Sequence, residues 1–533
     1  MAAITLYNVV MKEYKIPVTP TTTTGSASTN GLRATLHIDP GTVRADLDRR
    51  IFGSFVEHMG RCVYTGIYEP DHPTADRDGF RGDVGDLVRE LGPTVLRYPG
   101  GNFVSSYRWE DGIGPQQDRP TRLDLAWRGI EPNQVGIDEF VPWARSVGAE
   151  PMMAVNLGTR GVHEAIDVLE YSNHPSGTQL SDLRAANGSK EPHDVLMWCL
   201  GNELDGPWQM GQKTAEEYGR LAAETAKAMR VVDPRIELVA VGSSNSQMPT
   251  FGAWERTTLE HTYDQVDYIS LHAYYEELDG DRGSFLASAV DMDSFIDGVV
   301  STADHVGATR RSKRKLRLSF DEWNVWYQQR FVGQNQLEWQ FARPLIEDRY
   351  TAVDAVVVGS LLISLIEHAD RVAIACQAQL VNVIAPILTE PGGAAWRQTV
   401  FHPFALAARH ARGQVVGVGV GSPRYDTALY GDVPLLQATA TQDPGSGETC
   451  VLAVNRSQTD ALAVTVDLSG LGPVELLEHL LLAAEDGTTV NTAQAPDAVA
   501  PRVGTAPQRA EGTLEVLLPP VSFSVLRLRP VVS

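Results

Sequence analysis

Two glutamates each stand at the end of an apolar segment, where a pair of carboxyl groups could catalyse a hydrolysis. Glu203 ends the segment VLMWCLGNE, and Glu322 ends LRLSFDE. Because an apolar segment directly precedes each of them, we expect both carboxyl groups to be partly desolvated and held on rigid elements. When two such groups face one cleft, one protonates a leaving group and the other attacks a carbon. This is the chemistry of glycosidic-bond hydrolysis.

Simpler structural roles for these residues stay open. A glutamate after an apolar segment is more often a salt-bridged group at the rim of a domain. Asp321 directly precedes Glu322 and could be the functional acid instead. Because neighbours along a strand point to opposite sides, only one of the two is expected to face a cleft. Arg97 could be a structural ion-pair partner, and Tyr274 and Trp326 could be ordinary core aromatics.

Eight apolar segments between residues 50 and 405 end in glycine or polar residues, which is typical of buried parallel strands. Amphipathic stretches separate several of them, and residues 214–231 carry charged and apolar side chains at helical spacing. This alternation predicts an α/β fold, a (β/α)8 TIM barrel over residues 50–405. An open doubly wound sheet is the alternative, although no G-x-G-x-x-G opens a helix after the first strand. The eight segments are 51–57, 94–101, 150–158, 194–203, 237–244, 267–275, 316–323 and 372–380.

In a (β/α)8 barrel, catalytic groups lie at the carboxyl ends of the strands. The ends of the eight segments carry carboxylates, amides, aromatic rings and one arginine, which suit a neutral ligand with many hydroxyl groups. A phosphate ligand would favour a glycine-rich loop with a lysine, and none is apparent. The residues at these ends are Glu57 with His58, Arg97 with Asn102, Asn156, Asn202 with Glu203, Ser243 to Asn245, His272 with Tyr274, Asp321 with Glu322, and Gln377 with Gln379.

The chain outside the predicted barrel has a different pattern of apolar and polar residues. After about residue 405, apolar and polar residues alternate between turns rich in Gly, Pro, Asp and Asn, which predicts an antiparallel β-sandwich over residues 406–533. Residues 32–49 have the same alternation and could add a strand to that sandwich. Residues 1–31 include PTTTTGSASTNG and are predicted to be a disordered leader.

Composition and charge argue against some classes of partner. The 533 residues include 45 Lys and Arg against 67 Asp and Glu, and the net charge of −22 disfavours nucleic acid or an anionic membrane as a partner. The longest apolar segment, residues 355–366, is too short to span a bilayer. Lys12, Glu13 and Lys15 stand where a signal peptide needs apolar residues, so we predict a cytoplasmic protein.

The four cysteines lack the spacing of a zinc site or of a dense disulfide framework. Cys62, Cys199, Cys376 and Cys450 form no C-x-x-C pair, so we predict reduced, mostly buried thiols. No cluster of metal ligands is apparent either, and we therefore expect neither a metal nor a cofactor.

Long motifs around the candidate residues resemble those of the α-L-arabinofuranosidases of glycoside hydrolase family 51. The resemblance extends over residues 35–530 and implies a retaining enzyme. Its barrel would carry the catalytic glutamates on strands four and seven, and a jelly-roll-like sandwich would follow. The motifs are FGSFVEHMGRCVYTGIYEP (52–70), LRYPGGNFVSSYRWEDGIGP (96–115), WCLGNELDGPWQMG (198–211), VDYISLHAYY (266–275), LSFDEWNVWY (318–327) and CQAQLVNVIAPI (376–387).

The same resemblance implies a role for individual residues. Glu203 would be the general acid/base and Glu322 the nucleophile. Asn202 would bond the sugar 2-OH, and Trp127, less surely than Trp326, would shape the entrance for the leaving group. The implied substrate-binding residues are Glu57, Arg97, Asn102, Asn202, Tyr274, Trp326 and Gln379.

The resemblance also implies an activity. Terminal non-reducing α-L-arabinofuranosyl residues would be released from arabino-oligosaccharides, such as fragments of arabinan and arabinoxylan, by double displacement through a covalent arabinosyl-enzyme. The protein would form a homo-oligomer, a hexamer by family resemblance. A retaining endo-glucanase, a β-xylosidase and a non-catalytic carbohydrate-binding protein on a decayed barrel remain alternatives.

Overall fold

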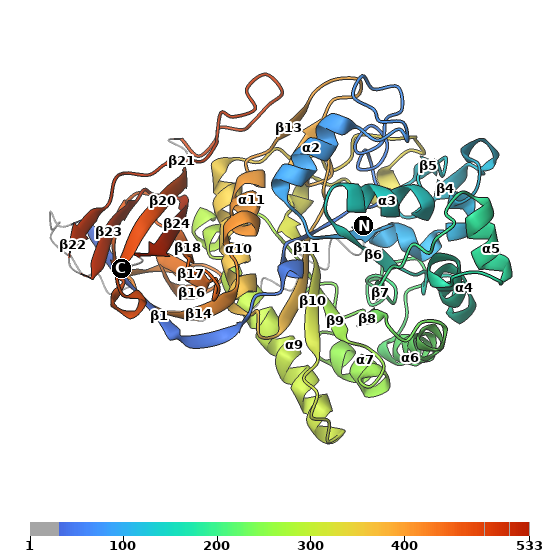
Figure 1. The fold of residues 1–533 in the computed structure, drawn as a ribbon, viewed down its shortest axis with the longest axis horizontal. Helices are drawn as coiled ribbons and strands as arrows, with labels where there is room; N and C mark the ends of the chain where they lie inside the picture. The colour runs from blue at the N-terminus through green and yellow to red at the C-terminus, as the bar shows by residue number, and fades with distance from the viewer. Residues whose placement is uncertain (1–30, 484–485, 511, 532–533) are drawn as a thin grey trace. The chain divides into compact units, whose positions relative to one another are not determined.

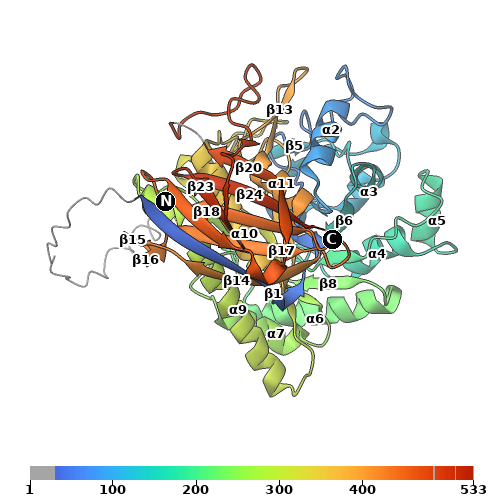
Figure 2. The ribbon, with the colours of Figure 1, turned by 60° about the vertical axis from the view of Figure 1, so that its left-hand side comes forward.

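The structure is a computed structural model that describes residues 31–483, 486–510 and 512–531 (Figures 1 and 2). The leader predicted over residues 1–31 lies, apart from Gly31, outside the described residues. Leu32–Ser533 forms one compact unit. All four cysteines are free and buried, which confirms the prediction made for them.

Eight parallel strands form a closed barrel in the order in which they follow along the chain. Each coincides with one of the eight predicted apolar segments, so the structure confirms the predicted (β/α)8 barrel. The strands are β2 (Gly53–Phe55), β3 (Val95–Tyr98), β6 (Glu150–Ala154), β7 (Met197–Cys199), β8 (Glu237–Ala240), β9 (Tyr268–Tyr275), β10 (Arg317–Val325) and β11 (Val372–Gln377).

Helices surround the barrel strands (Figure 1). The helix predicted over residues 214–231 is α6, and its first turn is closed by a capping box. In this box, Glu217 N donates to Thr214 Oγ1 and Thr214 N donates to Glu217 Oε2. The helices are α2 (Gly82–Leu91), α3 (Ile137–Ser146), α4 (Val162–Asn173), α5 (Gln179–Ala186), α6 (Ala215–Val232), α7 (Ala253–Thr262), α8 (Arg282–Leu286), α9 (Ala289–Thr309), α10 (Ala352–Glu367) and α11 (Phe401–His410).

Short hairpins and 3-10 turns lie in the loops. The hairpin of β4 (Arg122–Asp124) and β5 (Gly129–Glu131) lies in the connection that follows β3, and two 3-10 turns, Gln328–Arg330 and Gln334–Gln336, follow β10. Two further hairpins pair β12 (Ile387–Thr389) with β13 (Ala395–Arg397) and β15 (Arg424–Thr427) with β16 (Gly431–Pro434).

The C-terminal strands and β1 form a ten-stranded sheet with its own apolar cluster. The sequence predicted an antiparallel sandwich, and the structure corrects this at one pair of strands. β1 pairs antiparallel with β14 but parallel with β19. Figure 2 shows β1 running along the β14 side of this sheet. The strands are β1 (Leu32–Asp46), β14 (Gln414–Gly421), β17 (Leu436–Gln442), β18 (Thr449–Asn455), β19 (Leu462–Asp467), β20 (Val474–Ala483), β21 (Arg502–Val503), β22 (Gln508–Ala510), β23 (Thr513–Leu518) and β24 (Ser522–Pro530).

Helix α10, formed by the long apolar segment of the sequence, is buried along Ala352 to Ile366. It contacts barrel strands β10 and β11 as well as sheet strands β17, β18 and β24, so no face of it is left for solvent. Ser360 Oγ donates to Gln437 Oε1, and Phe523 packs directly on Gly359. Among the described residues, no helix combines the length and the apolar character that crossing a membrane would require.

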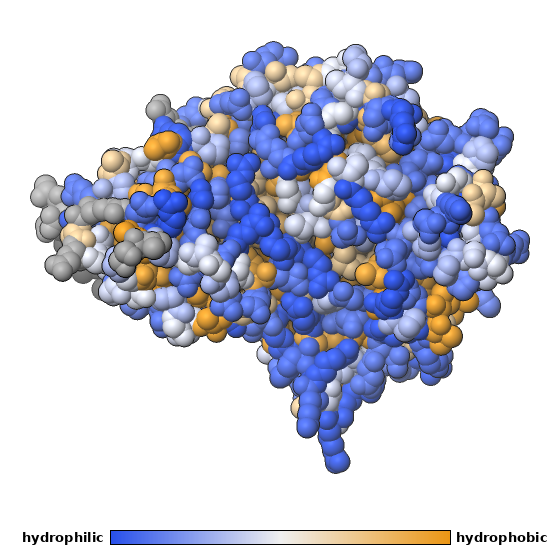
Figure 3. Space-filling view, viewed as in Figure 1, coloured by the Kyte–Doolittle hydropathy of each residue, from blue (hydrophilic) through white to orange (hydrophobic). Residues whose placement is uncertain are grey.

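The face of the molecule drawn in Figure 3 is mostly hydrophilic, with apolar side chains scattered in small groups. This distribution agrees with the burial of the apolar segments, which form the barrel, helix α10 and the interior of the sandwich.

The contact between α10 and β24 predicts how an alanine at position 359 would behave. A Cβ at Gly359 would lie 2.4 Å from Phe523 Cδ2, so Gly359→Ala should lower the free energy of unfolding by about 1–3 kcal/mol despite the better helix propensity of alanine. Gly85→Ala in α2 is the matched control, because its Cβ would make only ordinary van der Waals contacts, with the Arg89 side chain at 3.7 Å and with Val147 Cγ1 at 3.9 Å. Thermal denaturation should show a lower Tm for the first variant alone. An equal or higher Tm for Gly359→Ala would contradict tight packing between α10 and the sheet.

Candidate active site

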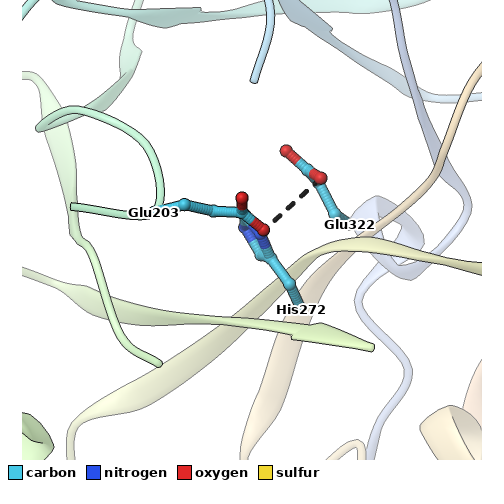
Figure 4. A group of neighbouring side chains, drawn as sticks. All are labelled: Glu203, His272 and Glu322. Carbon is cyan, nitrogen blue, oxygen red and sulfur yellow. Dashed lines mark hydrogen bonds and ion pairs between the residues drawn. The ribbon is translucent and has the colours of Figure 1, made fainter. Parts of the chain in front are cut away.

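The two predicted carboxyl groups meet at the mouth of the barrel. Glu203 follows β7, Glu322 lies on β10, and their side chains point toward one another beside His272 of β9 (Figure 4). One oxygen of each glutamate and one ring nitrogen of His272 lie within 4.8 Å of one another. All three residues are buried. Two carboxyl groups from strands that are not neighbours in the barrel therefore lie close together.

Both oxygens of Glu203 accept a hydrogen bond in this structure. Oε1 lies 2.9 Å from His272 Nδ1, and Oε2 accepts from Trp208 Nε1 at 2.7 Å. The turn that carries Glu203 needs unusual backbone, since Gly201 has φ 101° and Glu203 itself has φ 43°. The turn places the carboxyl group across the barrel mouth and fixes both of its oxygens.

Glu322 is held by two donors from different strands. Arg97 Nη1 of β3 donates to Oε1 at 2.7 Å, and the Tyr274 hydroxyl of β9 donates to Oε2 at 2.7 Å. Arg97 Nη2 also donates to Asn202 Oδ1 at 2.7 Å, so one guanidinium ties β3 to the groups after β7 and on β10. Burial alone would lower the pKa of Arg97, but the charges of Asp321 and Glu322 hold it well above its usual value.

Asp321 and Glu322 both face the interior of the barrel, which corrects the expectation that only one of them would. The register between β10 and β9 shifts from Ser319 opposite Ser270 to Glu322 opposite His272, so β10 has one extra residue. Such a bulge breaks the alternation of side chains along the strand. Burial would raise the pKa of Asp321, but Arg97 and His272 lower it, which favours a carboxylate.

His272 joins the two sides of the site. Its Nε2 lies 2.9 Å from Asp321 Oδ1, its Nδ1 lies 2.9 Å from Glu203 Oε1, and the same Nδ1 is 3.6 Å from Glu322 Oε2. Burial lowers the pKa of His272, but the Glu322 charge and the bonds to Asp321 and Glu203 outweigh burial and raise it to about 10. The ring is therefore an imidazolium at neutral pH.

Glu57, after β2, forms a second polar group at the same mouth. Its Oε1 accepts from Phe103 N at 2.9 Å and from Trp127 Nε1 at 2.8 Å, and its Oε2 accepts from Gln379 Nε2 at 3.1 Å. Burial and the charge of Glu322 raise the pKa of Glu57 to about 8. Gln379 Oε1 is buried and has no hydrogen-bond partner among the described residues, which leaves an acceptor for a hydroxyl group of a ligand.

The glycines of the Pro-Gly-Gly turn after β3 make room for both carboxyl groups. A Cβ at Gly100, where φ is 139°, would lie 2.4 Å from Glu57 Cγ, and one at Gly101 would lie 3.0 Å from Glu322 Oε1. Asn102 follows directly, and its Oδ1 accepts from Asn202 Nδ2 at 3.2 Å. The turn thereby brings Glu57 and Asn102 to the same side of the mouth.

The structure brings together the two glutamates predicted to be catalytic and the seven residues predicted to bind substrate. Trp326 packs against the outer side of Tyr274, and the two ring centres lie 5.2 Å apart. Three other polar segment ends serve the scaffold instead. Asn156 Nδ2 donates to Tyr107 O, Ser243 N donates to Glu255 Oε1, and Gln377 Nε2 donates to Asn324 Oδ1.

Comparison with known proteins assigns the chain to a family. Residues 87–282 match the α-L-arabinofuranosidase 1 domain, and residues 321–522 match the α-L-arabinofuranosidase C-terminal domain. An intracellular exo-α-(1→5)-L-arabinofuranosidase from Streptomyces lividans is 59% identical over 493 residues, 92% of this chain and 74% of that one. A solved family 51 α-L-arabinofuranosidase from Bifidobacterium longum matches with a TM-score of 0.90 at 48% identity, covering 93% of this chain and 100% of that chain. The chain belongs to the family 51 α-L-arabinofuranosidases.

A further relative of this arabinofuranosidase differs in the linkage that its name gives. The exo-α-(1→6)-L-arabinofuranosidase from Bifidobacterium longum is 50% identical over 497 residues, 91% of this chain and 95% of that one. Family membership makes the protein a glycoside hydrolase, which confirms the predicted enzyme class and the resemblance on which it was based.

The sequence prediction of the arabinofuranosidase site omitted three residues. His272 was named only as a polar strand end, although it lies two residues before Tyr274 and therefore shares its strand face. Asp321 was set aside because of the alternation that the bulge breaks. Trp208 lies five residues after Glu203 in the quoted motif, but no periodicity in a loop predicts that its indole returns to that carboxyl group.

The arabinofuranosidase carries a possible set of metal ligands in Glu203, His272 and Glu322. Their donor atoms are already engaged, because Arg97 and Tyr274 bind Glu322 and His272 binds Glu203. A cation would displace these bonds and would lie beside an imidazolium. The donor set therefore fits a metal ion poorly, and the expected absence of a metal or cofactor stays a prediction.

The charge of His272 gives a testable pH dependence of stability. Because folding raises its pKa to about 10, its contribution is fully present below the unfolded value near 6.5 and is lost as pH rises toward 10. The Tm difference between wild type and His272→Asn should therefore shrink between pH 6.5 and 10. His402→Asn is the control, since burial lowers the pKa of His402 to about 4 and keeps that ring neutral over the same range. A His272 difference that stays constant over this range would show that the native ring is neutral.

Proposed function

We propose that this arabinofuranosidase releases terminal non-reducing α-L-arabinofuranosyl residues from arabino-oligosaccharides with retention of configuration. The observation that carries this proposal is the short separation between the two glutamates, whose oxygens approach within 4.8 Å. Retaining enzymes hold their carboxyl groups roughly 5–5.5 Å apart, whereas inverting enzymes need roughly 6.5–9.5 Å to admit a water between them.

In the first step, a carboxylate oxygen of Glu322 attacks C1 of the arabinofuranosyl unit. The bond from C1 to the glycosidic oxygen breaks, and Glu203 gives its proton to that oxygen. Arg97 and Tyr274 support this role, because both donate to Glu322 and so hold its carboxyl group in one orientation. The product of the step is a covalent arabinosyl-enzyme.

In the second step, Glu203 is ionised and removes a proton from water. The water oxygen attacks C1, the bond to Glu322 breaks, and the sugar leaves with its original configuration. The hydrogen bonds that Glu203 makes with His272 and Trp208 support this role, because they fix its carboxyl group across from Glu322.

The sugar-binding roles follow from the polar groups around this pair. Asn202, held by Arg97 and by Asn102, would bond the 2-OH, a contact that tightens as positive charge develops on the ring. Glu57 and Gln379 would bind further hydroxyl groups, and Trp326 would border the leaving group.

The curated relatives support the substrate class without fixing the linkage. The names of two of them give different linkages, α-(1→5) and α-(1→6), so they do not single out one linkage for this chain. The proposed substrates remain fragments of arabinan and arabinoxylan. The word intracellular in the name of the Streptomyces lividans relative supports a cytoplasmic location for this chain.

Two proposals concern the organisation of the protein. We propose a homo-oligomer, a hexamer by family resemblance, and exposed apolar side chains on the β4–β5 hairpin and on the loop beside it support association between copies. These side chains are Leu123, Leu125, Ile130, Trp339 and Phe341. We also propose four segments: a leader at 1–31, a sandwich strand at 32–49, the barrel at 50–405 and the sandwich at 406–533.

A panel of substrates tests the activity. The wild type should hydrolyse p-nitrophenyl α-L-arabinofuranoside far faster than the β-D-xyloside or a soluble glucan, because the proposed substrate is an α-L-arabinofuranoside. The Glu322→Ala variant is the blank. Turnover of the xyloside or the glucan without the arabinofuranoside would support the rival hydrolases. Ligand binding without turnover of any substrate would support a non-catalytic protein.

Variants of the two glutamates test their separate roles. Glu322→Ala should lose at least about a thousandfold in kcat, because no nucleophile remains. Glu203→Ala should still be glycosylated by substrates with good leaving groups, and added azide should restore turnover and give an arabinosyl azide of retained configuration. Glu224→Ala, which removes an exposed acidic side chain on α6, is the control. An inverted azide from the Glu203 variant would reverse the two assignments.

A further inference from the structure

Four aromatic side chains form a continuous series along one side of the barrel mouth. The Phe331 ring lies 6.3 Å from the Trp127 ring and 6.2 Å from the Trp326 ring, measured between centroids. Trp326 in turn meets Tyr274 edge to face at 5.2 Å. Phe331 is thus the member that joins Trp127 to the pair formed by Trp326 and Tyr274.

Each end of this aromatic series touches a group of the catalytic site. At one end, Trp127 Nε1 donates to Glu57 at 2.8 Å. At the other end, the Tyr274 hydroxyl donates to Glu322 at 2.7 Å. The series therefore runs from the proposed sugar-binding carboxyl group to the proposed nucleophile, and Phe331 occupies its middle.

Phe331 lies outside the innermost polar ring. The polar residues that would bind the arabinofuranosyl unit are nearly fully buried, whereas Phe331 and Trp326 are only half-buried. A group bound against these two rings would lie further from the barrel interior than the arabinofuranosyl unit. The part of the substrate in that position is the leaving group.

The loop that carries Phe331 is hydrogen-bonded to the β4–β5 hairpin. Ile130 N donates to Gln340 O and Gln340 N donates to Arg128 O, both at 3.2 Å. Arg128 Nη1 also donates to Leu337 O at 2.8 Å. These bonds hold residues 337–340 of the loop after β10 against the β4–β5 hairpin. At the start of the same loop, Phe331 N donates to Gln328 O at 3.0 Å.

We propose that Phe331 is a specificity-determining residue that packs against the sugar unit on the leaving-group side of the scissile bond. This inference rests on the proposed function. An aromatic ring binds the C–H face of a sugar by burying apolar surface, and it discriminates by shape. Phe331 lies between Trp127 and Trp326 in the aromatic series, so its loss opens a gap at the point where the leaving-group sugar is proposed to lie.

The test compares two substrates that share the arabinofuranosyl unit and differ in the leaving group. Arabinobiose has a leaving-group sugar, whereas α-L-arabinofuranosyl fluoride has none. For Phe331→Ala, the ratio of kcat/KM for arabinobiose to kcat/KM for the fluoride should fall roughly tenfold, as expected for losing one aromatic contact. Phe331→Tyr keeps the ring and should restore the ratio. Val332→Ala, an exposed change at the next position, should leave it unchanged.

Two results would overturn the proposal. A parallel loss on both substrates would show that Phe331 only supports the fold of the loop, and an unchanged ratio would show that the ring does not contact the leaving group. Failure of the proposed function is distinguishable from both, because the wild type would then hydrolyse neither substrate.

Discussion

The charge balance around Arg97 is the constraint on which the site depends. Four acidic side chains share the barrel mouth, and burial of so many carboxyl groups is unfavourable unless cations lie among them. Arg97 reaches Glu322 and lies 3.6 Å from Asp321, and His272 contacts Asp321 and Glu203. The two cations come from different strands, β3 and β9, so the charges are compensated only when the barrel is closed. Closure of the barrel and assembly of the active site are therefore the same event.

The β10 bulge explains how one strand supplies two acids with different duties. With regular alternation, Asp321 would point outward and His272 would lack its Nε2 partner. The extra residue turns Asp321 inward, where it holds the imidazolium that in turn contacts Glu203. Glu322 remains free to accept from Arg97 and Tyr274. A local irregularity in one strand thus separates a carboxylate that orients its neighbours from one placed to react.

The sequence predicted most of the barrel and the centre of the site, for a physical reason. A strand buried on both faces reads as a short apolar run, and the polar residue that ends it marks the barrel mouth, so Glu203 and Glu322 could be placed without a structure. The bulge at Asp321 could not be predicted, because one extra residue leaves no mark on composition or periodicity. Trp208 and Phe331 were missed because they lie on loops, whose paths depend on contacts with distant segments. The parallel pairing of β1 with β19 was missed for the same reason.

The packing of helix α10 between the barrel and the sandwich determines whether the two halves can be separated in evolution. On β18, alternate residues belong to different clusters: Leu452 packs with the barrel and α10, and Val451 packs within the sandwich. The strand is therefore an interior strand of both halves of the molecule at once. An accessory module joined by a polar linker can be exchanged between proteins or lost without harm to its neighbour. Here, deletion of the sandwich would expose to water the side of α10 that packs on β17, β18 and β24. We therefore expect a gene rearrangement that separates the two halves to give an aggregating barrel rather than a smaller enzyme.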